Sequence, residues 1–432
     1  MNVLTRKCSG FHLSVIAAMA MLMLALGYTT PAAAQAMPAV AAEALLSKHV
    51  DQLRSLGKAP QAFVLDRLKD HDLVVFDDGL HTAADPFAFY IDLVASAEFQ
   101  KLAPSIFLEV IPSNRQRALD AYLRSFPENP ALLYPAFQDD FGWAYQSYFD
   151  LLHAIHVANR GLPKEHSIHV VAVSTPSLWG EIKSIEDWNY KVDRAPLARD
   201  YFMYALIRDG LDDFQSGRKG IFLTNSRHAY TRMKLPDGTP VRSTTAFFTM
   251  WHPGKAYSIR FDEPALLVHG RRHDTADAKT AAGMEDVEYT WTRVADGLWD
   301  EAFRAYGKGP VAVTLDDTVF GDAKYVGNLM LGVAPGQTMR DAYDAVIFLR
   351  DFDELRKTAV TDAIYTPDFK RELEHRYQLS QTPEQIATML HESNAGSLHE
   401  YIEKEYSAQP AQPLHEAAVA GPIDAWRKKP QP

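Results

Sequence analysis

The stretch from Leu73 to Val94, LVVFDDGLHTAADPFAFYIDLV, joins an apolar run to an amphipathic segment through two aspartates, a glycine and a histidine. An apolar run without alternation is typical of a strand that is buried on both faces of a sheet. The segment after it has the spacing of a helix. In α/β proteins, ligands and catalytic groups collect where the strands end. Asp77, Asp78 and His81 are therefore predicted to lie at that edge of a sheet.

The chain repeats this alternation of apolar runs and longer helical patterns from about residue 61 to residue 350. Several runs are apolar throughout, as in strands that are covered on both faces. The alternation predicts an α/β fold with a mostly parallel or mixed central sheet and helices on both faces. We expect strands at DLVVF (72–76), SIFLEV (105–110), IHVVAVS (168–174), GIFLTN (220–225), TAFFTMW (245–251), AYSIRF (256–261), PVAVTL (310–315) and DAVIFL (344–349).

Composition divides the chain into segments. Arg6 and Lys7 precede an apolar run and a small-residue cleavage pattern, so residues 1–36 are predicted to be a secretory signal peptide. The α/β domain is expected at 37–352, with a charged, alanine-rich insertion at about 263–297. A helical C-terminal extension is expected at 353–407, and residues 408–432 have the composition of a disordered tail.

The bulk properties argue against several classes of protein. The 432 residues carry a formal net charge of -11 and no basic cluster with interleaved aromatics, which argues against nucleic acid as a partner. Cys8, the single cysteine, lies inside the predicted signal, so the mature chain would lack disulfides, thiolate metal sites and a cysteine nucleophile. Beyond the signal, no apolar run is long enough to cross a membrane. These features predict a periplasmic or secreted protein and leave its oligomeric state open.

Further polar side chains end or follow the predicted strands. Glu109 ends SIFLEV and His228 follows GIFLTN, so both are expected to join Asp78 and His81 in one pocket at the sheet edge. A carboxylate and imidazole pair can deprotonate water, a second carboxylate can orient it, and a second histidine can stabilise an oxyanion. Alternatively, His81, Glu109 and His228 would hold a divalent metal ion that activates the water.

Each of these residues also has a purely structural interpretation. Aspartate followed by glycine is a common turn pair, so Asp78 fits a turn as well as catalysis. His228 by itself fits the core as well as a site. Glu109 favours function, because a carboxylate among large apolar residues is costly unless it is paired. Since His81 would lie at a pocket mouth, we expect its replacement to affect turnover far more than stability.

The order of these motifs resembles a superfamily that unites erythromycin esterases, ChaN-like haem-iron-binding proteins and Tiki/TraB-type metalloproteases. Its members carry a Gly-Glu-x-x-His-like motif after the first strand, a Leu-Glu strand end, an Arg-Asp helix and a later strand end with a histidine. The matching motifs lie between about residues 73 and 352 and are DDGLH with Asp78 and His81, LEV with Glu109, RDYFMYAL with Arg199 and Asp200, and TNSRHA with His228. Asp77-Asp78 replaces the usual Gly-Glu, so the acidic arm is one methylene shorter.

The resemblance implies an exported hydrolase whose His/carboxylate pocket activates water against an ester, lactone or amide of a small-molecule substrate. It also implies two alternatives, a periplasmic haem- or metal-binding protein of the ChaN type and a catalytically degenerate member with a structural role. The cofactor would then be a divalent metal or haem. The implied site residues are Asp78, His81, Glu109 and His228 for catalysis, and Arg199, Asp200 and Asp77 for substrate binding.

Overall fold

The computed structural model describes residues 39–79, 81–102, 105–271, 287–327 and 333–414. The predicted signal peptide, 1–36, lies outside these residues. None of the helices in the described ranges is both long enough and apolar enough to cross a membrane.

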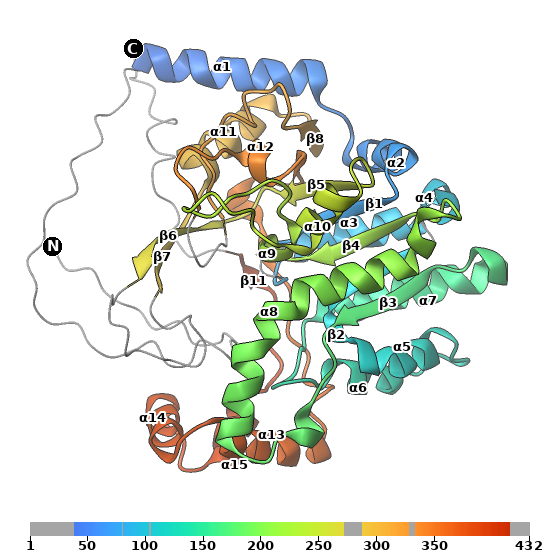
Figure 1. Cartoon of the computed structure of the whole chain (residues 1–432), viewed down its shortest axis with the longest axis vertical. Coiled ribbons are helices and arrows are strands. Elements are labelled where there is room, and N and C mark those ends of the chain that lie inside the picture. Colours follow the sequence, from blue (N-terminus) through green and yellow to red (C-terminus); the bar gives the residue numbers. More distant parts are fainter. Residues whose placement is uncertain (1–38, 80, 103–104, 272–286, 328–332, 415–432) are drawn as a thin grey trace, which may run out of the picture.

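A seven-stranded sheet forms the centre of the molecule and confirms the predicted α/β class (Figure 1). All neighbouring strands are parallel, except that the edge strand β8 runs antiparallel to β9. The order across the sheet is β3 (His169–Ser174), β2 (Ser105–Pro112), β4 (Gly220–Thr224), β1 (Leu73–Asp77), β5 (Ala256–Phe261), β9 (Ala345–Phe348) and β8 (Val311–Thr314).

Helices cover both faces of this sheet, which explains why its strands are apolar throughout. In β1, Val74 and Phe76 belong to one core, whereas Leu73 and Val75 belong to the other. The first core is closed by α2 (Pro60–Asp70), α3 (Ala84–Ala95), α4 (Ala97–Leu102), α5 (Gln116–Leu123), α6 (Tyr134–Phe137) and α7 (Gln146–Gly161). The second is closed by α1 (Ala39–Leu56), α8 (Ile185–Gly210), the short α9 (Ser226–Ala229), α10 (Thr244–Trp251), α11 (Leu298–Tyr306) and α12 (Met339–Ala342).

The strand predicted at 245–251 is wrong, because this segment is helix α10. Threonine and phenylalanine favour strands intrinsically, but such preferences yield to tertiary packing. Phe247 and Phe248 pack into the core between α8 and the sheet, and Trp251 is exposed. The missed signal is Ser243, whose hydroxyl caps the helix by accepting from the N–H of Ala246 at 3.0 Å.

A separate two-stranded antiparallel sheet lies within the segment expected as an insertion. Its strands are β6 (Ala265–Arg271) and β7 (Val287–Thr292). As far as the structure describes the chain, they form no ladder with the central sheet. The predicted insertion therefore begins with a strand directly after the end of β5.

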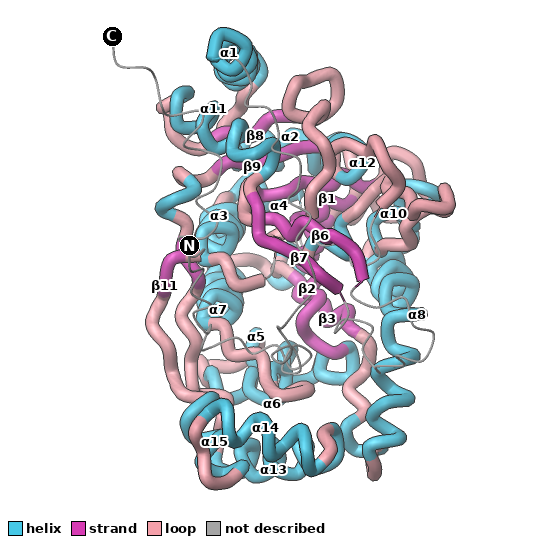
Figure 2. The backbone as a smooth tube through the Cα atoms, turned by 90° about the vertical axis from the view of Figure 1, so that its left-hand side faces the viewer, coloured by secondary structure: helices cyan, strands magenta, loops and turns pink. Residues whose placement is uncertain are grey.

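The C-terminal region is helical, as predicted, and lies at the end of the molecule opposite α1 (Figure 2). Its helices are α13 (Pro367–Ser380), α14 (Pro383–Ser393) and α15 (Leu398–Glu405). Helix α13 contacts α8, and the Arg376 guanidinium lies 4.9 Å from the ring centre of Trp179, a cation–π contact. The described start of the expected tail is held to the body, since β11 (Gln412–Pro413) pairs with β10 (Arg356–Lys357).

The cap of α10 provides a test of the helix that the sequence concealed. Ser243→Ala should lower the free energy of unfolding by about 1–2 kcal/mol, because it removes the cap and the hydroxyl's bond to the Tyr230 carbonyl at 2.5 Å. Chemical denaturation measures the change. Ser397→Ala, which removes an exposed cap from α15, is the matched control and should cost no more than about 1 kcal/mol. An unchanged free energy in Ser243→Ala would contradict the capping role.

Candidate functional site

The parallel register brings the ends of four adjacent strands to one edge of the sheet. Asp77, the last residue of β1, lies opposite Thr224 of β4 and Arg260 of β5. Glu109 follows the paired Leu108 of β2 and so reaches the level at which β4 ends. Side chains that are far apart in the sequence therefore meet at this edge.

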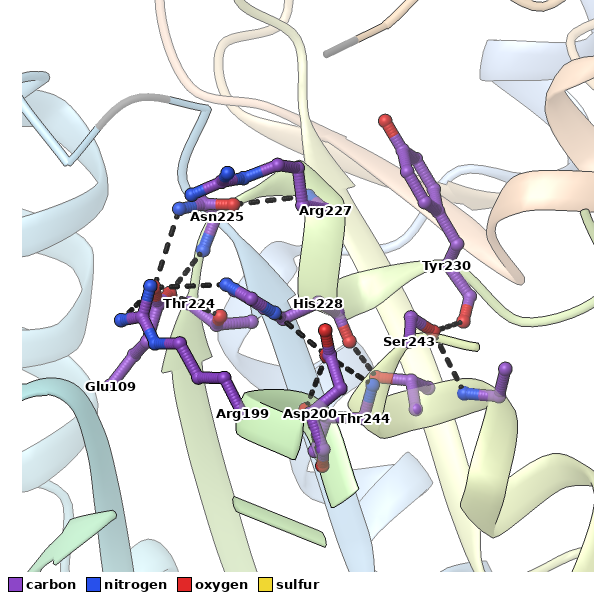
Figure 3. A network of polar contacts seen from close by, with 12 residues as sticks. Glu109, Arg199, Asp200, Thr224, Asn225, Arg227, His228, Tyr230, Ser243 and Thr244 are labelled. Atoms are coloured by element: carbon purple, nitrogen blue, oxygen red, sulfur yellow. Dashed lines mark hydrogen bonds and ion pairs between the residues drawn. The ribbon is translucent and has the colours of Figure 1, made fainter. Parts of the chain in front are cut away.

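The carboxylate of Glu109 is the centre of a network of polar contacts at this edge (Figure 3). Its side chain is 2% exposed. Its Oε2 accepts hydrogen bonds from the Thr224 hydroxyl at 2.5 Å and from the backbone N–H of Asn225 at 3.0 Å. Nε2 of His81 lies 3.2 Å from the same oxygen.

The second oxygen of Glu109, Oε1, faces two cationic groups. Nη2 of Arg199, from α8, donates to it at 2.9 Å, and Nε2 of His228 lies 3.1 Å away. Arg199 also donates to the Ser174 hydroxyl at the end of β3, at 3.3 Å. A buried carboxylate is tolerated only when such partners compensate for its lost hydration. Glu109 is thus compensated from several elements of the fold.

His81 is held beside Asp78 in a turn with an unusual backbone. Its φ of 65° lies in the left-handed region, which a residue other than glycine seldom adopts and which is enriched at functional sites. Nδ1 of His81 lies 2.7 Å from Oδ1 of Asp78 in a buried ion pair that is not aligned as a hydrogen bond. Within the described residues, neither oxygen of Asp78 accepts a hydrogen bond.

His228 has a carboxylate partner of its own. Its Nδ1 lies 2.7 Å from Oδ1 of Asp200, which belongs to α8. The same oxygen accepts from the backbone N–H of Thr244 at 2.6 Å and from its hydroxyl at 2.7 Å. Each histidine therefore has a carboxylate at Nδ1, and both turn Nε2 toward opposite oxygens of Glu109.

Charge coupling shifts the pKa values of both histidines upward. Burial lowers the pKa of His81, but Asp78 and Glu109 outweigh it and raise this pKa to about 10. Burial likewise opposes the charged form of His228, and Asp200 and Glu109 raise its pKa. Contact with carboxylates therefore favours the protonated form of both imidazoles.

The three carboxylates respond differently to burial. Burial raises the pKa of Asp78 to about 6, and His81 limits the rise. Burial also opposes ionisation of Glu109, but the two histidines and Arg199 hold its pKa well below the usual range. The pKa of Asp200 is lowered, because His228 and Thr244 outweigh the effect of burial. Asp78 is the carboxylate of this group that protonates most readily.

Two expectations from the sequence need correction. Asp77, expected to bind substrate, is instead buried and accepts hydrogen bonds from Gly79 N–H at 2.9 Å, the Ser226 hydroxyl at 3.0 Å and the Tyr343 hydroxyl at 2.5 Å. Asp77 therefore fixes the turn rather than facing a ligand. His81 is buried too, with its ring against Trp143, so its replacement will also reduce stability.

Two residues at this edge were missed in the sequence. Glu263 follows the end of β5, the same signal that marked Glu109, but it was assigned to the insertion. It is buried, its Oε1 has no hydrogen-bond partner within the described residues, and its pKa is raised well above the usual range, first by burial and then by Asp78 and Asp77. Arg227 lies beside His228 in α9, where its charge gave no signal on its own.

The proposed ligand set of His81, Glu109 and His228 does not fit a metal ion. Both oxygens of Glu109 already accept hydrogen bonds, including one from the Arg199 guanidinium that a cation would have to displace. Across the part of the chain that the structure describes, no group of three or more His, Cys, Asp or Glu side chains is arranged to hold a metal.

Comparison with known proteins gives structural neighbours only. No family model and no curated protein matches the chain. A succinoglycan biosynthesis protein shares 8% identity at a TM-score of 0.45, over 71% of this chain and 97% of its own. A mutant of the erythromycin esterase EreC in its open conformation shares 10% at 0.42, over 67% and 92%. ChaN of Campylobacter jejuni, described with cofacial haem, shares 10% at 0.28, over 53% and 89%.

These neighbours include the esterase and haem-binding types that the motif order resembles. Likenesses at these identities and TM-scores assign neither a family nor an activity. We therefore infer function from the geometry of the site.

The DDGLH turn depends on Gly79. Its φ of +68° disfavours any side chain, and a Cβ there would lie 2.6 Å from Oε2 of the buried Glu263. Gly79→Ala should therefore lower the free energy of unfolding by more than about 1 kcal/mol. Gly238→Ala is the matched control, since Gly238 has a φ of +83° and nothing within 4 Å of an added Cβ. Equal losses in the two variants, measured by denaturation, would show that the Glu263 contact contributes nothing.

The raised pKa of Glu263 predicts a pH-dependent stability difference. Because the folded protein binds this proton more tightly than the unfolded chain, stability is lost as pH rises above the ordinary value of 4.5 toward the folded pKa. Glu263→Gln mimics the neutral acid and has no such proton to lose. As pH rises through that window, the free energy of unfolding of the variant minus that of the wild type should increase by up to about 1.4 kcal/mol per pH unit.

Urea denaturation at pH 5, 7 and 9 measures the Glu263→Gln difference. Glu98→Gln, an exposed change on α4, is the control and should show a constant difference from the wild type. A constant difference in Glu263→Gln as well would contradict the raised pKa.

Proposed function

We propose that the chain is an exported hydrolase that uses the two Asp-His pairs around Glu109 to cleave an ester, lactone or amide. One observation carries this proposal. His81 and His228 each have a carboxylate 2.7 Å from Nδ1 and direct Nε2 to within about 3.2 Å of one shared carboxylate. A carboxylate beside Nδ1 favours the tautomer with its proton on that nitrogen, which an acid–base histidine requires. Export rests on the N-terminal sequence pattern alone.

His81 is the proposed general base. When it is neutral with its proton on Nδ1 toward Asp78, its Nε2 accepts from the side-chain amide of Asn225, which lies 3.2 Å away. This is the form that can take a proton from water as the water attacks a carbonyl carbon. Asp78, whose own pKa is raised to about 6, stabilises the imidazolium that results. When the tetrahedral intermediate collapses, this imidazolium returns its proton to the leaving alkoxide or amine.

His228 is the proposed electrophilic partner. Asp200 and Glu109 raise its pKa and so favour the imidazolium, which would donate to the carbonyl oxygen as that oxygen gains negative charge. Asp200 already accepts two hydrogen bonds from Thr244 at Oδ1 and its pKa is lowered, so it orients His228 without taking its proton. Glu109 keeps the two imidazoles at a fixed separation, and Arg199 holds Glu109.

Access to the network is most open on the side of α8. The side chains of Arg199 and Asp200 are 26% and 21% exposed, whereas those of His81, His228 and Glu109 are at most 5% exposed. A substrate carbonyl would therefore approach past Arg199. This arrangement also excludes bulk water from the two imidazoles, which strengthens their electrostatic effect.

The proposal predicts how turnover depends on His81 and on pH. In the wild type, kcat/KM for 4-nitrophenyl esters and simple lactones should rise about tenfold per pH unit from neutrality toward pH 10, because the base must first lose a proton. His81→Asn should lower kcat by about 10²–10⁴ and abolish this rise. His153→Asn, at a 57% exposed histidine that pairs with Glu128, is the matched control and should change neither.

The same assays separate the alternatives. Thermal unfolding of each variant identifies the temperatures at which it stays folded. Within that range, a lower rate cannot be due to unfolding. If the wild type hydrolyses none of the esters, lactones or amides tested, the hydrolase proposal is wrong. Unchanged hydrolysis in His81→Asn together with lost haem uptake would favour the binding protein instead.

A further inference from the structure

Arg227 is an arginine beside the network, and no acidic residue in the described part of the chain forms an ion pair with it. It lies in α9, two residues after Asn225, whose side chain accepts from the backbone N–H of Arg227 at 3.0 Å. Its side chain runs back over that of Asn225, and no marked contact reaches its guanidinium (Figure 3). Among the described residues, no carboxylate forms an ion pair with Arg227, and its buried Nε has no hydrogen-bond partner.

Arg227 differs from the other basic side chains at the site. Arg227 lies beside the network, because its backbone N–H donates to Asn225, which itself contacts Glu109 and His81 (Figure 3). The other cationic or basic side chains there each contact a carboxylate, since Arg199 and both histidines contact Glu109 and each histidine also contacts its own aspartate. Among the described residues, Arg227 is thus a partly buried cation with no carboxylate in contact, and desolvated cations are costly when unpaired.

We propose that Arg227 binds an anionic oxyacid group, a carboxylate or a phosphate, that the substrate carries beside its scissile carbonyl. A guanidinium offers a planar fork of donors that matches both anions. That this anion belongs to a substrate rests on the proposed hydrolase function. The proposal narrows the substrate class to esters, lactones or amides that carry an acidic group. Arg199 differs in role, since Glu109 and Ser174 already engage it.

Binding tests the anion site without requiring turnover. Calorimetry would compare levulinate, a keto acid that cannot be hydrolysed, with the neutral ketone 2-pentanone and with inorganic phosphate. The wild type should bind levulinate or phosphate more tightly than 2-pentanone. Arg227→Gln should lower the affinity for the anion by about 10- to 100-fold and leave the affinity for 2-pentanone unchanged. Arg227→Lys should retain part of the affinity. The control is Arg124→Gln, at a 73% exposed arginine, which should bind as the wild type does.

Kinetic measurements test whether Arg227 also recognises the acidic group of a substrate. The wild type should prefer monomethyl adipate to dimethyl adipate, and Arg227→Gln should lower this ratio of kcat/KM about tenfold or more, mainly through KM. Tighter binding of levulinate than of phosphate would identify a carboxylate substrate, and the reverse order a phosphorylated one.

The outcomes separate the two proposals. Anion binding that depends on Arg227, without hydrolysis of any ester, would support the anion site and contradict the hydrolase proposal. Hydrolysis without a charge preference, with equal anion binding in wild type and Arg227→Gln, would overturn the anion site and leave the hydrolase standing. Failure of the wild type to bind either anion would also overturn it.

Discussion

The burial of one ionised carboxylate, that of Glu109, constrains the rest of the site. Removing such a group from water costs several kcal/mol unless charged and polar donors replace the water. The donors come from the turn after β1, the end of β4, the helix α9 and the long helix α8. Because β2, β4 and β1 are adjacent in the sheet, these elements converge on Glu109 without any unusual connection.

The two Asp-His pairs look alike but differ electrostatically. Asp200 accepts two hydrogen bonds from Thr244, and its pKa is lowered. Asp78 accepts none within the described residues, and burial raises its pKa to about 6. Titratable groups whose surroundings push their pKa values apart mark the acid and base roles of a site. The contrast agrees with the proposed roles, in which His81 exchanges a proton and His228 keeps its charge.

The DDGLH segment now has a physical explanation. Asp77 anchors the turn to the core, while Asp78 and His81 face Glu109 from it. Gly79 supplies the left-handed backbone between them and leaves room for the Glu263 carboxyl. One short turn thus places the structural carboxylate of Asp77 directly before Asp78, which pairs with His81 three residues further on.

The sequence determined the class of fold because burial on both faces makes a strand apolar throughout, and that pattern is local. It likewise indicated which polar residues end strands, so Asp78, His81, Glu109 and His228 could be named in advance. It misassigned residues 245–251, whose strand-forming side chains become helical through packing and the Ser243 cap.

Only the tertiary structure decided the partners, because pairing depends on strand order and register between segments far apart in the chain. Asp200 reaches His228, Arg199 reaches Glu109, and Asp77 turns into the core. Burial and charge balance exist only in the assembled site. They alone distinguish Arg227, which lacks an ion-pair partner in the described residues, from the paired Arg199.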